Sequence, residues 1–109
     1  MSILSTPAPV WQWPADVHDF GVRNQIESFL DPLLAATHQV FSTLRNLRVF
    51  LQLDPEIPND WHIVFEVQVP CSDIPDYVQA QHAWTNELFR ICPSPLVCIF
   101  CLALVPVDV

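Results

Sequence analysis

Lysine is absent from this chain of 109 residues, whose positive charge comes from four arginines: Arg23, Arg45, Arg48 and Arg90. Without lysine, Schiff-base chemistry and lysine-based phosphate binding are excluded. Nucleic acids and anionic membrane surfaces attract clustered Lys and Arg, so neither is expected as a direct partner. Twelve acidic residues bring the net charge to −8, which suits a basic protein partner or solubility alone.

Glycine is almost absent too, since Gly21 is the single one. A single glycine excludes phosphate-cradling loops, the dinucleotide-binding motif and the G-x-S-x-G nucleophile elbow. It also excludes collagen-like and glycine-linker sequences. Charged residues are scarce at 15%, against about 25% in an average domain, while apolar residues reach 51%. This composition builds a core and excludes wholesale disorder, and the length fits one domain.

Long hydrophobic runs and export signals are also lacking. The longest apolar run, residues 96–105, is shorter than the ~18 residues that a membrane span needs. Residues 1–7 have neither a basic region nor a long apolar stretch, so we expect no signal peptide and a cytoplasmic protein. The cysteines are then expected to be reduced thiols that act as small hydrophobic side chains. They are Cys71, Cys92, Cys98 and Cys101.

The N-terminal segment is rich in proline and tryptophan. Pro9 and Pro14 flank Trp11 and Trp13, and proline at this density forbids a helix interior and favours extended backbone. We therefore predict an extended arm over residues 1–21, whose indoles pack on the domain or on a partner. A single α+β domain is predicted over residues 22–109.

The first half of that domain predicts a helix and a hairpin. Apolar residues at helical spacing predict a helix from Pro32 to about Leu44, with Asp31 as its N-cap and a short helical turn before it. One kinked helix is the alternative. Residues 47–53 and 61–69 alternate between apolar and polar side chains and predict an antiparallel hairpin around an acidic loop. On its polar face, Arg48 and Glu66 are placed to form an ion pair.

The second half predicts a helix and a last strand. Residues 72–76 predict the start of a helix, with a capping side chain, an early proline and carboxylates in its first turn. Tyr77, Trp84 and Leu88 fall on one face of this helix, and residues 92–95 end it. Residues 96–105 have no polar position and predict a strand buried on both faces. The fold class is therefore α+β: a small antiparallel or mixed three-stranded sheet with helices on one face, in the order α-β-β-α-β. A right-handed crossover makes the third strand parallel to the second, with a place beside the first strand as one arrangement.

No residue pattern indicates catalysis, a cofactor or a metal site. The histidines (His18, His38, His62 and His82) have no serine or cysteine nucleophile at a motif spacing, and surface roles are favoured. Cys98-x-x-Cys101, with Cys92 and His82, has ligand types that suit zinc. We reject that site because strand residues three apart point to opposite faces. The carboxylate pairs stand at turns and helix starts, where they cap backbone groups. These pairs are Asp16 with Asp19, Asp54 with Glu56, and Asp73 with Asp76.

These observations predict a non-enzymatic, acidic protein-binding module, such as an antitoxin-type, immunity-type or accessory subunit. Its partner would be a more basic protein, such as a toxin or nuclease. The alternative is a homodimer, formed through residues 96–105, with a structural or ligand-binding role. The third hypothesis is a small enzyme whose histidine and carboxylates meet only in the fold. The predicted partner-binding residues are Asp54, Glu56, Asp60, Trp11, Trp13, Val97, Ile99 and Val105.

Overall fold

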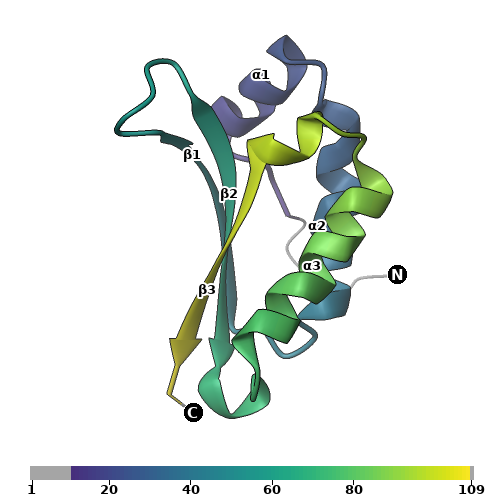
Figure 1. Cartoon of the computed structure of the whole chain (residues 1–109), viewed down its shortest axis with the longest axis vertical. Coiled ribbons are helices and arrows are strands. Elements are labelled where there is room, and N and C mark those ends of the chain that lie inside the picture. The colour runs from purple at the N-terminus through teal and green to yellow at the C-terminus, as the bar shows by residue number, and fades with distance from the viewer. Residues whose placement is uncertain (1–10, 109) are drawn as a thin grey trace, which may run out of the picture.

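A mixed sheet carries the helices on one of its faces (Figure 1). The computed structural model describes residues 11–108. Its main elements are α1 (Ala15–Arg23), α2 (Leu30–Val40), β1 (Asn46–Leu53), β2 (Trp61–Pro70), α3 (Tyr77–Ile91) and β3 (Phe100–Val107). Short 3-10 turns η1 (Glu27–Phe29), η2 (Cys71–Asp73) and η3 (Leu96–Ile99) precede α2, α3 and β3. The predicted α+β class and the order α-β-β-α-β are confirmed, with α1 added ahead of them.

β2 is the central strand of the sheet. It pairs antiparallel with β1 and parallel with β3. The predicted hairpin and the parallel third strand are therefore confirmed, and Arg48 Nη2 lies 3.2 Å from Glu66 Oε2. The arrangement with the third strand beside the first is wrong, because β3 lies on the far side of β2. The central position explains why Val64, on the face away from the helices, is only 4% exposed.

The core lies between the sheet and the helices. From β2, alternate side chains from Ile63 to Val69 point to this side and are almost fully buried. Phe65 lies at their middle, with its ring centroid 5.9 Å from that of Trp84 on α3. Leu30 and Leu33 of α2 belong to the same core. Among the described residues, none of the helices combines the length and the apolar character that a bilayer span requires.

Thr37 of α2 is the buried polar side chain of the described core. Its hydroxyl accepts a hydrogen bond from the indole Nε1 of Trp84 at 2.9 Å and donates one to the carbonyl of Leu33 at 2.7 Å. The bond to Trp84 joins α2 to α3 across the core. Because the indole N–H is buried, it depends on this one acceptor among the described residues.

Thr37→Val is expected to lower the free energy of unfolding by about 1–3 kcal/mol, since it leaves the indole N–H of Trp84 buried without a partner. The shape of the side chain is kept, so loss of packing contributes little. Urea unfolding measures the change as a lower midpoint at an unchanged slope. Thr43→Val, in the exposed turn after α2, is the matched control and should stay within about 0.5 kcal/mol. Equal losses in both variants would contradict the role of this hydrogen bond.

The prediction of an extended arm is wrong for residues 15–21, which belong to α1. Pro14 is the last proline of the segment and occupies the N-cap, where a missing N–H costs nothing. The buried side of α1 comprises Val17, Phe20 and Gly21, a helical spacing. The predicted boundary between residues 21 and 22 falls inside this helix. Residues 1–10 of the predicted arm lie outside the described residues.

The predicted bounds of the next helix are also corrected. α2 begins at Leu30 rather than Pro32, and the predicted short turn before it is confirmed as η1. Asp31 lies in the first turn, where its Oδ1 accepts a hydrogen bond from the indole of Trp13 at 2.8 Å, instead of serving as N-cap. The helix ends at Val40, four residues before the predicted end, because residues 41–43 form a turn. The two hydroxyl residues in that turn favour non-helical backbone.

The prediction of a strand over residues 96–105 buried on both faces is wrong in two respects. Residues 96–99 form η3, a turn in which the carbonyls of Pro93 and Pro95 accept backbone hydrogen bonds. The strand that follows lies at the edge of the sheet, and only Phe100 of it is buried. A continuous apolar run has no periodic pattern. The sequence therefore could not show whether these residues form a turn or a strand, or whether the strand lies at the edge or the centre of the sheet.

Candidate functional site

The end of the β1–β2 hairpin, residues 53–61, combines exposed hydrophobic side chains with carboxylates. We call this segment the hairpin tip. Its exposed apolar side chains are Leu53, Ile57 and Trp61, and its carboxylates are Asp54, Glu56 and Asp60. Exposed apolar groups gathered beside charge are typical of contact surfaces rather than of a solvated loop.

Asp54 fixes the shape of the hairpin tip. Its Oδ1 accepts hydrogen bonds from the backbone N–H groups of Glu56 at 2.8 Å and Ile57 at 3.0 Å. These two bonds favour the charged carboxylate and hold the pKa of Asp54 below its usual value. The backbone N–H of Asp54 also donates to the carbonyl of Asp60 at 2.8 Å. The tip is therefore an ordered turn, as its aspartates at turn positions predict.

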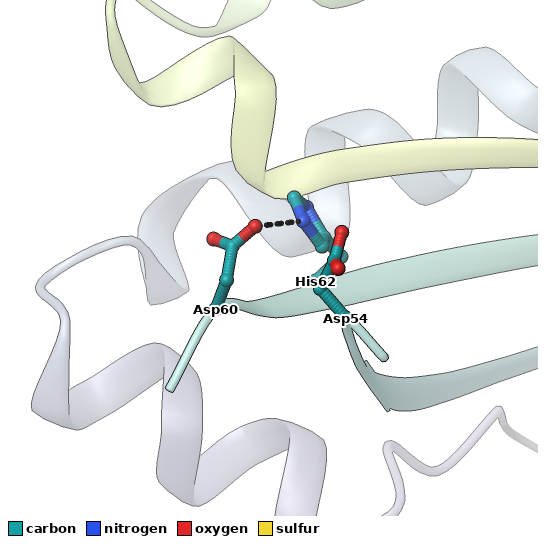
Figure 2. Close-up of side chains that lie close together, drawn as sticks. All are labelled: Asp54, Asp60 and His62. Atoms are coloured by element: carbon teal, nitrogen blue, oxygen red, sulfur yellow. Dashed lines mark hydrogen bonds and ion pairs between the residues drawn. The ribbon is translucent and has the colours of Figure 1, made fainter. Parts of the chain in front are cut away.

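His62 joins the hairpin tip to the segment that leads into β3. Its Nε2 lies 3.0 Å from Oδ2 of Asp60, and its Nδ1 lies 3.0 Å from the carbonyl oxygen of Cys98 in η3. Figure 2 shows the imidazole between the two carboxylates, with Asp60 on one side and Asp54 on the other. One ligand atom each of Asp54, Asp60 and His62 lie within 4.8 Å of one another.

A shallow groove of about 390 Å³ runs between α3 and the start of β3. Trp84 and Leu88 of α3 line it together with Leu102 of β3 and Val97 of η3. Phe89 also lines the groove and leaves 58% of its surface exposed. We call this feature the α3–β3 groove. Its lining is mainly apolar, which fits the side chains of a peptide better than a charged metabolite.

Within the part of the chain that the structure describes, β3 has no strand paired to its outer edge, beside this groove. Among the described strands it pairs with β2 alone. The strand has no charged residue. It contains Pro106, which has no backbone N–H to donate, and an edge strand tolerates such a residue. Register with β2 places Phe100, Leu102 and Leu104 toward the helices. Native proteins protect such edges with charge, bulges or a covering chain, and within residues 11–108 β3 has neither a charged residue nor a second strand paired to it.

The predicted partner-binding residues fall into three places. Asp54, Glu56 and Asp60 lie together in the hairpin tip, and η3, which holds Val97 and Ile99, adjoins it through the bond between His62 and Cys98. Val105 lies further along β3, on the face away from the helices. Trp11 and Trp13 pack against the core of the domain. The Trp13 ring stands edge-on to Phe65, with centroids 6.2 Å apart.

The cysteines do not form a cluster of metal ligands among the described residues. Cys98 lies in η3, where its Sγ donates to the carbonyl of Pro95 at 3.1 Å, while Cys101 lies in β3. Burial raises the pKa of the Cys92 and Cys101 thiols, and the charge of Asp60 adds to the effect at Cys101. Raised pKa values keep these thiols protonated at neutral pH, which opposes metal ligation and nucleophilic attack.

A histidine and carboxylates do meet in the fold, as the enzyme hypothesis requires. Asp54, Asp60 and His62 are, however, half-buried at the surface, and they do not line the α3–β3 groove. Water-exposed groups of this kind lack the enclosed pocket in which general acid–base catalysis is effective.

Phe89 and Trp61 are exposed aromatic residues that the sequence patterns did not indicate as surface residues. The helical face of α3 was assigned from Tyr77, Trp84 and Leu88, and Phe89 falls one position outside it. The available signal was a large aromatic residue off the buried face of an amphipathic helix, and its place in the lining of the α3–β3 groove is what gives it significance.

Comparison of the chain with models of protein families, with curated proteins and with solved structures gives no match. The described residues and their geometry therefore carry the functional argument.

Proposed function

We propose that the protein is a non-enzymatic binding module that adds a strand of its partner to the free edge of β3. The observation that carries the proposal is an uncharged edge strand beside the apolar α3–β3 groove. The backbone groups along such an edge supply hydrogen bonds to an extended segment. The groove then accepts every second side chain of that segment, because side chains alternate along a strand.

The charge of the protein supports a basic partner. The net charge is −8, and Asp54 and Asp60 lie at the end of the sheet where β3 begins. A lysine or arginine at the corresponding end of the added segment would meet these carboxylates. Complementary charge of this kind speeds encounter and sets orientation more than it adds affinity.

The wider role that fits these features is that of an accessory, antitoxin-type or immunity-type subunit in the cytoplasm. Such a subunit binds a more basic protein and masks its surface. The scarcity of basic residues supports this role. With only four arginines, the protein repels a basic partner weakly, and direct binding of nucleic acid is unfavourable.

A homodimer is the second candidate, and the same edge favours it. Two copies of β3 related by a twofold axis would pair antiparallel and join their sheets. The absence of charge along β3 removes the usual barrier to such pairing. In this case the edge is occupied by a second copy, and the role is structural or ligand-binding.

Val105→Lys tests both candidates, because it places a charge on the edge strand. Partner capture from the lysate of the natural source, followed by light scattering of the purified complex, measures the effect. We expect wild-type protein to form a stoichiometric complex with a basic protein that weakens in high salt. Val105→Lys should lower the affinity at least about tenfold.

Val78→Lys is the matched control, since Val78 is an α3 residue with 63% of its surface exposed and the charge change is identical. It should bind as the wild type does. A wild-type dimer that Val105→Lys converts to a monomer would favour the homodimer instead. Unchanged complexes in both variants would overturn strand addition at β3.

A further inference from the structure

We propose that Asp54, Asp60 and His62 form a binding site for a zinc-like divalent transition-metal ion at the hairpin tip. Asp54 follows the last residue of β1, Asp60 precedes β2, and His62 is the second residue of β2, so the antiparallel hairpin brings the three together (Figure 2). The site does not depend on strand addition at β3, although the carboxylates of Asp54 and Asp60 are also those proposed to meet a basic residue of the partner.

The orientation of His62 is the first argument. Its Nδ1 faces the carbonyl oxygen of Cys98 at 3.0 Å, and a carbonyl only accepts, so Nδ1 carries the hydrogen. Its Nε2 faces the carboxylate of Asp60, which also only accepts. A proton on Nε2 joins the two groups as an ion pair. In the neutral ring the lone pair on Nε2 faces the negative oxygen instead, and a metal ion bound by both atoms takes the place of that proton.

The Cys98 carbonyl is also the partner that metal-binding histidines require. A ligating imidazole almost always donates its other N–H to a backbone carbonyl or carboxylate, which fixes the ring and its tautomer. This carbonyl belongs to η3, which lies 36 residues from His62 in the sequence. The orientation is thus built by the tertiary fold and not by the loop itself.

The ligand chemistry selects the class of ion. Imidazole nitrogen with carboxylate oxygens suits Zn²⁺ and similar first-row ions, whereas Ca²⁺ and Mg²⁺ prefer oxygen alone. At zinc–ligand distances of about 2.0–2.2 Å, the ligand atoms of a tetrahedral site lie roughly 3.3–3.6 Å apart. The Asp60 and His62 atoms are 3.0 Å apart and all three ligand atoms lie within 4.8 Å of one another, so binding draws the Asp54 carboxylate inward.

Asp54 supplies the third ligand of the proposed site. Both of its backbone hydrogen bonds end on Oδ1, so Oδ2 is the oxygen available to an ion. Three protein ligands leave a fourth position for water or an external group, an arrangement typical of open zinc sites.

Titration with Co²⁺ and with Zn²⁺ tests the proposal on the full-length protein. We expect one ion per chain by calorimetry and a visible Co²⁺ spectrum of nitrogen and oxygen ligation, with no thiolate charge-transfer band. His62→Gln and Asp60→Asn should each weaken binding at least about tenfold, in line with the cost of disturbing a metal site. Asp54→Asn retains the Oδ1 acceptor and should also weaken binding.

Glu56→Gln is the matched control, because it removes the same charge from the same loop without touching the three ligands. It should bind within about twofold of the wild type, on the basis that an exposed charge contributes little. Equal weakening in Glu56→Gln would show non-specific attraction to an acidic loop and overturn the site. So would a thiolate band, or no saturable binding at millimolar ion. Circular dichroism of each variant confirms that the fold is retained.

Discussion

Phe65→Ala is expected to lower the free energy of unfolding by about 3–5 kcal/mol, the largest effect of any single substitution proposed for this protein. Phe65 is fully buried on the central strand, with its ring centroid 6.2 Å from Trp13 and 5.9 Å from Trp84. Truncation removes both aromatic contacts and leaves a cavity beside Trp13 and Trp84. Because small domains are stable by about 5–15 kcal/mol, much of the total stability is lost.

Urea unfolding followed by tryptophan fluorescence measures this effect, since two neighbouring indoles report on the cavity. Phe89→Ala is the matched control, because its ring is 58% exposed on α3. That variant should change stability by less than about 0.5 kcal/mol and should weaken partner binding at the α3–β3 groove. If Phe65→Ala is too unstable to purify, Phe65→Leu should show an intermediate loss. A loss below that of Phe89→Ala would contradict a core centred on Phe65.

Elements with a clear period were predictable from the sequence. The alternation in residues 47–53 and 61–69 predicted the hairpin and its Arg48–Glu66 pair, because burial of one sheet face imposes a period of two. The start of α3 was predictable only approximately, because the cap and first turn were placed within residues 72–76. In the structure Cys71–Asp73 form η2, and Asp76 is the N-cap, whose side chain accepts a hydrogen bond from the N–H of Gln79 at 3.1 Å. Local chemistry decided these elements.

Elements without a period were not predictable in the same way. Residues 96–99 are as apolar as β3, and only the neighbouring prolines distinguish turn from strand. The extended arm was predicted to reach residue 21 because residues 1–14 are rich in proline. No proline follows Pro14 before residue 32, so the residues that form α1 contain none. A prediction that treats each proline as a local boundary would have placed the start of α1 correctly.

The candidate site was predictable in part. Asp54, Glu56 and Asp60 stand out in the sequence as an acidic turn. The contact between His62 and the Cys98 carbonyl could not be predicted, because it depends on the parallel pairing of β2 with β3, two strands that α3 connects along the chain. The α3–β3 groove likewise depends on how side chains of two elements fit together. Sequence patterns show which face of an element is buried but not how closely two elements approach.

Cys92 is expected to react with iodoacetamide about 10²–10³ times more slowly than Cys71 at pH 8. Cys92 is 1% exposed at the end of α3, so a reagent reaches it only when the structure opens, which costs several kcal/mol in a stable domain. Burial also raises the pKa of its thiol, so less reactive thiolate is present at any given pH. Burial of the side chain and the raised pKa of the thiol both slow the labelling of Cys92. The raised pKa also shifts the labelling of Cys92 to higher pH.

Mass spectrometry of the labelled peptides measures the rates of all four cysteines in one sample. Cys71, which is exposed in η2, is the internal control, and Cys101 should lie between the extremes because burial raises the pKa of its thiol as well. In concentrated urea the four rates should converge, since the unfolded chain protects none of them. Phe65→Ala should raise the rate at Cys92 in proportion to its loss of stability if global opening exposes the thiol. An unchanged rate at Cys92 in that variant would mean that local fraying of the end of α3 governs access. Labelling of Cys92 as fast as Cys71 in the wild type would contradict its burial against the core.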